Sequence, residues 1–231
     1  MIEAKNVALT YPDGTEALRE VSLLINPGEL IYITGPSGSG KTSLLKLLIG
    51  IEQPTLGELK VMGQQMEKIS SKELKKLRKA IGPVFQEFKL VEGRTALENV
   101  MMGMRFLGIA PKKIKADAQD ALTKVGLGHK LHTRVEKLSW GEAQRVAIAR
   151  AVARKPTLIL ADEPTGNLDQ ANATNILQIL KSFLNEHTTV VVTTHATHLI
   201  DNDPDASFVR VNSGFITIER SGGKVNEDST V

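Results

Sequence analysis

The stretch ITGPSGSGKTSLLKLLIG, residues 33–50, decides the fold. It begins at the end of a short apolar run that is typical of a buried strand, and it ends in an apolar pattern with helical spacing. The turn between them, Gly35 to Thr42, fits G-x-x-x-x-G-K-[ST]. Glycines at these positions let a backbone direct its N–H groups at phosphate oxygens. The stretch therefore predicts an α/β domain with a phosphate-binding loop.

The residues of this loop have distinct expected roles. Lys41 is the expected cation for the β and γ phosphates, and the hydroxyl of Thr42 suits Mg²⁺, which prefers oxygen ligands. The helix that begins here adds its positive N-terminal dipole. A purely structural glycine turn would not require Lys followed by Thr, and the glycine order is not the G-x-G-x-x-G of dinucleotide folds. The expected nucleotide-binding residues are Gly35, Pro36, Ser37, Gly38, Ser39, Gly40, Lys41, Thr42 and Ser43.

A second motif is PTLILADEPTGNLD, residues 156–169, an apolar strand that ends in Asp162 and Glu163. Ligands of α/β sheets bind at the carboxyl ends of the strands, so both carboxylates are expected at the site. Asp162 suits the Mg²⁺ shell, and Glu163 suits a general base that polarises water for attack on the γ phosphate. An Asp-Glu pair before Pro164 can also simply begin a turn. Beside a phosphate loop, the functional interpretation is the stronger one.

Two single residues are expected at the same edge. Gln86 follows the strand pattern AIGPVF, and His195 follows TTVVVTT. A lone Gln or His at such a place is more often a loop residue with a local hydrogen bond. Their shared position favours function, because an amide can orient water or join the metal shell and an imidazole can bond a phosphate oxygen. The expected catalytic residues are thus Glu163, His195 and Gln86.

Composition excludes several classes of protein. The chain has 231 residues, 41% of them hydrophobic, which is enough for a sizeable core. Without cysteine it has no disulfide framework and no thiolate metal site. A formal net charge of +3 without a polybasic run does not suggest nucleic acid. The N-terminal residues lack a signal-peptide pattern, and no apolar run approaches the roughly 20 residues of a membrane span. We expect a soluble chain whose membrane role needs a partner.

The order of elements predicts a single domain over residues 1–231. A core of about 1–87 and 155–220 is expected to surround a helical lobe of about 88–154, with a mobile polar tail at about 221–231. The lobe contains three helical patterns, TALENVMMGMRFLG, KKIKADAQDALTKVG and GEAQRVAIARAVAR. Strands are expected at about 2–9, 20–26, 29–34, 57–62, 81–85, 157–162, 188–194 and 206–211.

Taken in order, these motifs resemble those of the ATP-binding subunits of ABC transporters. The resemblance covers nearly the whole chain, and residues 77–100 and 160–169 look most like the subgroup that contains FtsE, LolD and MacB. The matching features are Tyr11, the Walker A run 35–42, Gln86, the signature region 138–142, the Walker B strand 158–163, the D-loop that ends at Asp169, and His195.

The resemblance implies a fold and a mode of action. The fold would be a P-loop ABC ATPase with a mainly parallel sheet, an N-terminal antiparallel portion and an all-helical lobe. Tyr11 would stack on adenine, and two subunits, expected to be identical, would enclose two ATP molecules. Ser139, Gly141 and Glu142 would face the ATP held by the other subunit. Turnover would require Mg²⁺.

The resemblance also implies partners. An integral membrane subunit of permease type would bind the Gln86 loop and the helical lobe, with Phe88, Leu90 and Met102 as candidate contacts. The chain would then be cytoplasmic and peripheral on the inner face of the cell membrane, and no nucleic acid partner is expected. An alternative is a scaffold with low turnover in a membrane complex, as in an FtsE-like cell-division role.

One residue departs from the family pattern. The signature turn usually reads L-S-G-G-Q or L-S-G-G-E, whereas this chain has LSWGE, residues 138–142. Ser139 and Glu142 form the S-x-x-E pattern of a capping box, which makes Trp140 the first helical residue. A tryptophan would be strained if the usual glycine were needed for a positive φ. Its ring would pack either within its own lobe or in the dimer interface, where it would tune closure.

Overall fold

The computed structural model describes residues 1–201 and 203–219, so the expected tail at 221–231 lies outside the described residues. Two compact units are present, one formed by residues 1–77 and 191 onward and the other by residues 78–190. The division falls within the helix α2 (Ser71–Ala80) and the strand β8 (Thr189–Thr194). Within the described residues, no helix is long and apolar enough to cross a membrane.

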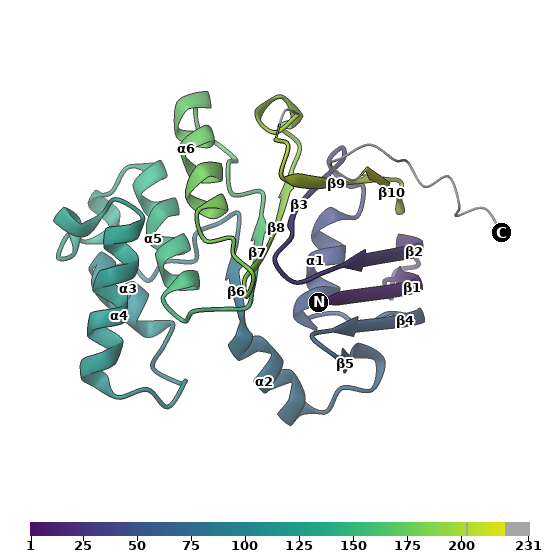
Figure 1. Ribbon diagram of the computed structural model, residues 1–231, viewed down its shortest axis with the longest axis horizontal. Coiled ribbons are helices and arrows are strands. Elements are labelled where there is room, and N and C mark those ends of the chain that lie inside the picture. The colour runs from purple at the N-terminus through teal and green to yellow at the C-terminus, as the bar shows by residue number, and fades with distance from the viewer. Residues whose placement is uncertain (202, 220–231) are drawn as a thin grey trace. The chain divides into compact units, whose positions relative to one another are not determined.

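The first unit contains an antiparallel sheet of four strands in the order β2-β1-β4-β5, of which Figure 1 shows β1, β2 and β4 side by side. Along β1 buried residues alternate with more exposed ones over most of its length, the pattern of a sheet with one face in the core. The strands are β1 (Ile2–Thr10), β2 (Glu16–Ile25), β4 (Leu56–Val61) and β5 (Gln64–Gln65).

The same unit carries the strand that leads into the phosphate loop. β3 (Leu30–Thr34) is buried at every residue and pairs in parallel with β9 (Ala206–Asn212). β10 (Phe215–Glu219) pairs antiparallel with β9. The loop after β3 ends in α1 (Lys41–Ile49), which contacts β2. A buried parallel strand thus holds one end of the loop, and a helix with four buried leucines holds the other.

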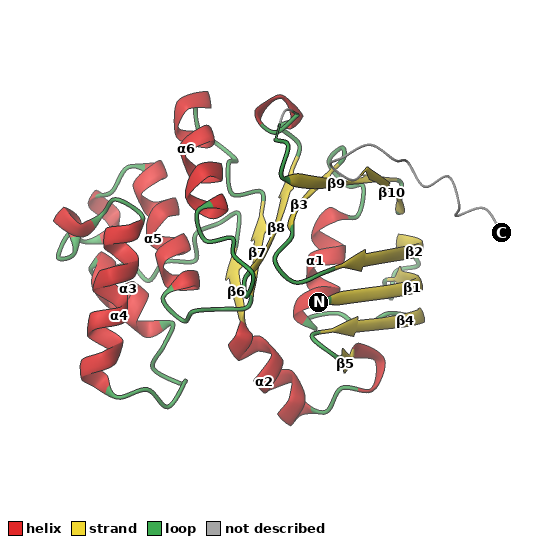
Figure 2. Cartoon of the chain, in the orientation of Figure 1, coloured by secondary structure: helices red, strands yellow, loops and turns green. Residues whose placement is uncertain are grey.

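The second unit joins a parallel pair of strands to a group of helices. β6 (Ile81–Val84) pairs in parallel with β7 (Leu158–Asp162). The helices α3, α4 and α5 contact one another, as the red ribbons of Figure 2 show, and α5 also contacts β6 and α6. The helices are α3 (Ala96–Met102), α4 (Pro111–Lys124), α5 (Trp140–Val152) and α6 (Gln170–Lys181).

Short 3-10 turns complete the described elements. They are Met66–Lys68, Gly128–Lys130, Val135–Lys137 and Thr197–Leu199. From residue 88 to residue 154, a range that the structure describes in full, every named element is helical, and a single isolated bridge joins Thr95 to Arg134. The expected helical lobe lies wholly within the second unit.

The expected elements are present, with four differences. β2 begins at Glu16 rather than at residue 20. The first helix of the lobe ends at Met102, because residues 103–108 form turns that leave Phe106 90% exposed. β10 was not expected, although Ser213 (φ 49°) and Gly214 (φ 86°) form the two-residue turn of positive φ that closes a hairpin. The two-residue strand β5 was also missed.

Candidate functional site

The phosphate loop of the first unit requires glycine at two positions. Gly35 has φ 146°, and a Cβ added there would collide with the carbonyl oxygen of Val211. Gly40 has φ 114°, and a Cβ there would collide with the carbonyl oxygen of Ala17. Both conformations are ones that L side chains rarely adopt. The loop can therefore pack this closely only because it lacks side chains at its two ends.

The loop presents donors that suit a phosphate. Lys41 is only 4% exposed, and its ammonium donates to the carbonyl oxygens of Gly35 (2.9 Å) and Pro36 (3.0 Å). The buried hydroxyl of Ser39 has no hydrogen-bond partner among the described residues. Gly40 is the N-cap of α1, and no side-chain cap covers this helix end. Backbone N–H groups and the dipole at a helix N-terminus favour an anion.

Tyr11 lies against the beginning of α1. Its hydroxyl and that of Ser43 are 3.1 Å apart, within hydrogen-bonding distance. The ammonium of Lys46 lies over the tyrosine ring, 5.5 Å from its centroid. Tyr11 is therefore held next to the phosphate loop by two residues of the helix that follows the loop, one through its hydroxyl and one through its ring.

His195 also belongs to the first unit. It directly follows β8 and is exposed. The residue before it, Thr194, accepts a hydrogen bond from the N–H of Ala196 (3.0 Å) through its hydroxyl, which turns the chain at the end of the strand. Tyr11, the loop residues 35–43 and His195 are thus the expected site residues that lie in this unit.

The second unit brings Gln86 and Glu163 to the same end of the strand pair. Val84 of β6 is in register with Ala161 of β7, and Gln86 and Glu163 each lie two residues further along the chain from this pair. A Cβ at Gly166 would lie 3.6 Å from the Gln86 side-chain nitrogen, so this amide packs against the turn that follows Glu163. Asp162 ends β7 and is partly buried.

The backbone at Glu163 is unusual. Its φ of 42° lies in the left-handed region, which costs an L-residue roughly 1–2 kcal/mol. The N–H of Gly166 donates to the Glu163 carbonyl oxygen (3.1 Å) and closes the turn. Such a conformation persists where surrounding contacts hold it, and residues of this kind cluster at functional sites.

The signature turn of the second unit has the expected capping box. The Ser139 hydroxyl accepts from the N–H of Glu142 (3.3 Å), and the Glu142 carboxylate accepts from the N–H of Ser139 (3.0 Å). Lys130 pairs with the same carboxylate (2.6 Å) and is the main cause of its lowered pKa. Neither Trp140 nor Gly141 has a positive φ. A tryptophan is therefore accommodated without backbone strain.

Sequence reasoning missed Arg150. Its guanidinium donates to the carbonyl oxygens of Phe88 and Lys89, both at 2.6 Å, and so holds the Gln86 loop on α5. Burial lowers the pKa of Arg150. Lys89 has a φ of 50°, a left-handed conformation within the segment that the arginine holds. The one sequence signal for a buried role of Arg150 is its place as the only charged residue in the apolar helix pattern AIARAV, residues 147–152.

The acidic residues do not form a metal site of their own. Across residues 1–201 and 203–219, no group of three or more His, Asp or Glu side chains could hold a metal ion. Proteins usually bind Mg²⁺ through one or two oxygen ligands together with substrate phosphates. Thr42, Asp162 and Gln86 offer oxygen ligands of that kind.

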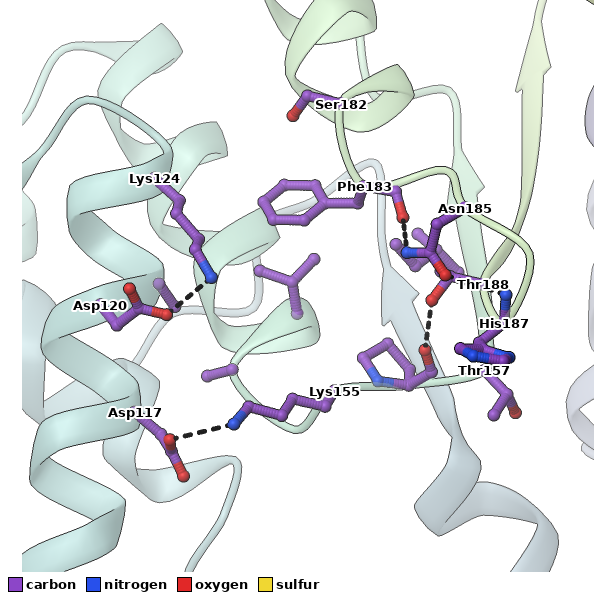
Figure 3. Close-up of a pocket in the computed structure, with 15 residues that line it drawn as sticks. Asp117, Asp120, Lys124, Lys155, Thr157, Ser182, Phe183, Asn185, His187 and Thr188 are labelled. Carbon is purple, nitrogen blue, oxygen red and sulfur yellow. Dashed lines mark hydrogen bonds and ion pairs between the residues drawn. The ribbon is translucent and has the colours of Figure 1, made fainter. Parts of the chain in front are cut away.

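A separate cavity of about 530 Å³ lies within the second unit (Figure 3). α4 forms one wall, where Asp120 pairs with Lys124 (2.8 Å), and the segment around Phe183 forms the other. Thr157 and Thr188, which precede β7 and β8, also line it. The cavity therefore lies at the amino ends of strands, whereas ligands of α/β sheets bind at the carboxyl ends. None of the expected site residues lines it.

The phosphate loop, the two strand-end motifs and the capped signature turn together define a class of nucleotide-binding protein. The sequence profile of the family described as ABC transporter matches residues 18–166, and the chain belongs to this family as an ATP-binding subunit. It is 38% identical over 224 residues to the cell division ATP-binding protein FtsE of Bacillus subtilis, covering 97% of this chain and 98% of that protein. FtsE of Escherichia coli K12 is 41% identical over 200 residues, or 87% and 90% of the two chains.

A solved structure supports the fold. The chain is similar to the ATP-binding cassette MJ0796 in a dimeric, post-hydrolysis state bound to ADP and Pi, with a TM-score of 0.85 and 35% identity. The match covers 97% of this chain and all of that one. The expected P-loop ABC fold is therefore confirmed, and so is membership of the FtsE-like group.

Proposed function

We propose that the chain is an Mg²⁺-dependent ATPase that works as a dimer on a membrane complex. The observation that carries this proposal is the phosphate loop, where two obligatory glycines, a buried Lys41 and an N-terminus of α1 without a side-chain cap make a cradle for an anion. ATP hydrolysis is the activity of its family.

Binding begins with the loop. Backbone N–H groups of the loop 35–43, in which Pro36 has none, and the α1 dipole hold the phosphates. Lys41 exchanges one or both of its carbonyl partners for phosphate oxygens. The Ser39 hydroxyl gains a partner in this state. Tyr11 offers its ring to adenine from the position that Ser43 and Lys46 give it.

Hydrolysis is a matter of positioning and electrostatics. Glu163 accepts a proton from the attacking water, which bonds to the γ phosphorus as the bond to the β–γ bridging oxygen breaks. Gln86 orients that water, and His195 bonds a γ-phosphate oxygen. Bound Mg²⁺, held by Thr42, Asp162 and Gln86, would neutralise charge on the phosphates.

A second copy and a membrane subunit complete the proposed assembly. Ser139, Gly141 and Glu142 face the ATP of the other copy, where the α5 N-terminus contributes backbone donors. The membrane subunit contacts the Gln86 loop and the lobe at 88–154, with Phe88, Leu90 and Met102 as candidate contacts; all three side chains are partly exposed. The lobe moves with that subunit, and the chain is peripheral on the inner face of the membrane.

Substitution of Glu163 tests the activity. Glu163→Gln keeps the shape of the side chain and removes the base, so ATP binding should persist while steady-state turnover falls by about 100-fold or more. Dimers should accumulate in ATP and Mg²⁺, as measured by sizing. Lys41→Ala should instead weaken ATP binding, because the loop loses its one fixed cation. Near-normal turnover in Glu163→Gln would remove Glu163 from the base role, and unchanged affinity in Lys41→Ala would contradict the phosphate-loop assignment.

A low-turnover scaffold is the second candidate function. The half-exposed Trp140, in place of the usual glycine of the signature turn, is the observation that favours it. ATP would then hold a membrane complex together rather than drive repeated cycles. Turnover measured with and without the membrane partner separates the two, since a scaffold should stay slow in both conditions.

A further inference from the structure

Trp140 touches two loops that carry proposed catalytic residues. Its indole ring meets the ring of Phe88 edge to face, with centroids 4.6 Å apart and an interplanar angle of 64°. Its N–H donates to the carbonyl oxygen of Gly166 (3.3 Å). Phe88 lies two residues after Gln86, and Gly166 lies three residues after Glu163. All of these residues belong to the second unit.

The hydrogen bond from Trp140 to Gly166 is connected to Glu163 by a second hydrogen bond. The Gly166 carbonyl accepts from the indole, and the Gly166 N–H donates to the Glu163 carbonyl (3.1 Å). Two hydrogen bonds through one peptide residue thus connect the signature turn to the backbone of the proposed base. That backbone has a left-handed φ of 42°, a conformation that needs external support.

The ring contact between Trp140 and Phe88 involves the Gln86 loop. The Gln86 loop is held on α5 by Arg150 through the backbone at Phe88 and Lys89, and the Phe88 ring rests on Trp140. The Gln86 amide in turn packs against Gly166. One indole therefore contacts the Gln86 loop and the turn that follows Glu163, and these two also contact each other.

The burial of Trp140 argues against a purely structural role. The side chain is 49% exposed, whereas the core of this unit consists of fully buried aliphatic residues such as Val146, Ile148 and Leu160. Tryptophan is highly buried on average, so an indole that stabilised the fold mainly by burial would be covered more fully than this one. The indole N–H donates to the backbone carbonyl of Gly166, although half of the side chain faces solvent and water could have accepted the same hydrogen bond.

We propose that Trp140 is a positioning residue for Glu163. Its hydrogen bond to Gly166 holds the turn that follows Glu163, and its ring contact with Phe88 couples that turn to the Gln86 loop. This inference rests on the proposed function, in which Glu163 is the base. The indole takes over a position that the family usually gives to glycine, and it makes the placement of the base depend on the loop that follows β6. Removing the N–H donor loosens the Glu163 turn and leaves the nucleotide-binding loop untouched.

Three variants separate the two contacts. Trp140→Phe keeps an aromatic ring near Phe88 and removes the donor to Gly166. Phe88→Leu removes the partner ring and keeps the donor. Phe106→Leu is the matched control, because Phe106 is an aromatic residue of the same unit that is 90% exposed. All are made in the full chain.

The kinetic result expected for Trp140→Phe is a split between kcat and KM. The kcat for ATP should fall by about fivefold, the equivalent of one neutral hydrogen bond, with KM within about twofold. The melting temperature should change by no more than about 2 °C, because little burial is lost. Phe106→Leu should match wild type in all three. A Trp140→Phe protein with wild-type kcat would overturn the proposal, as would a loss of activity accompanied by an equal loss of folded protein.

Hydrogen exchange gives a readout that does not depend on turnover. In protein without nucleotide, the peptide that contains Gly166 should exchange about fivefold faster in Trp140→Phe than in wild type or Phe106→Leu. Phe88→Leu should shift the emission of Trp140, the only tryptophan in the chain. Unchanged exchange at Gly166 would overturn the proposal even in an inactive protein. A wild-type chain without ATPase activity, but with this exchange difference, would contradict the proposed function alone.

Discussion

Lys41 shows how a single residue prepares the phosphate loop. Burying an ammonium is costly unless it is hydrogen-bonded, and this one is bonded to two carbonyl oxygens of its own loop. Both acceptors come from residues just before the lysine, so the loop curls around the cation that it will present. In the proposed function this charge is already in place, and nucleotide binding exchanges its partners rather than ordering a free side chain.

Tyr11 supports a prediction of the same kind. Tyr11→Ala removes the ring expected to stack on adenine, which should weaken ATP binding by about 1–3 kcal/mol. Tyr11→Phe keeps the ring and loses only the hydrogen bond to Ser43, so its affinity should stay within about threefold of wild type. Titration calorimetry of Glu163→Gln protein, which should not consume ATP, measures both. Equal affinities in the two variants would mean that adenine binds elsewhere.

Two helices of the second unit begin in the same way. α3 starts with a capping box of Thr95 and Glu98, and α5 starts with one of Ser139 and Glu142. Both boxes satisfy N–H groups that a helix leaves without partners at its first turn. Only the second lies in the signature turn. The pair therefore offers a way to separate the stability of a helix end from its part in turnover.

Alanine at each cap tests this separation. Ser139→Ala and Thr95→Ala should each lower the free energy of unfolding by about 1 kcal/mol, because each helix loses a side-chain acceptor. Only Ser139→Ala should also lower ATP turnover beyond its loss of folded protein. Urea unfolding and steady-state kinetics measure the two effects. Equal turnover in the two variants, corrected for folded fraction, would show that Ser139 serves the helix alone.

Three carboxylates at the beginnings of helices have lowered pKa values in the folded molecule. The backbone N–H of Thr95 lowers the pKa of Glu98, and the N–H of Asn172 lowers that of Asp169. The Lys130 ammonium lowers the pKa of Glu142. In each case the folded protein binds the proton less tightly than the unfolded chain does. The stability from these groups is therefore fully present above their ordinary pKa values and is lost as the pH falls through the folded values.

The sign of this effect predicts acid sensitivity. The ordinary values are 4.5 for the two glutamates and 3.8 for the aspartate, so the melting temperature should change little through these groups above about pH 5.5. Below about pH 4.5 it should fall progressively. Thermal melts from pH 7 to pH 3 measure this, with Glu142→Gln as the comparison, since its curve should be flatter. A melting temperature that rises on acidification would contradict the assignment.

Much of the fold and of the candidate site could be read from local patterns. The phosphate loop needs a strand, glycines, a lysine and a helix in one continuous stretch, so it could be predicted from residues 33–50. Its close contacts with Ala17 and Val211 could not. The capping box of α5 and the carboxylates at the end of β7 are local in the same sense. The hairpin of β10 was missed, although its signal, a turn of two positive-φ residues, is equally local.

The partners of Trp140 could not be read in this way. The pattern S-W-G-E predicts a capped helix and leaves the ring free to turn toward its own lobe or toward a second subunit. Its contacts with Phe88 and Gly166 depend on the packing of loops that follow β6 and β7, far from it in the chain. Arg150, which bonds carbonyls 61 and 62 residues away, is a similar case. Which distant residue a side chain contacts is decided by tertiary packing, because the contact forms only when the elements that carry both residues are in place.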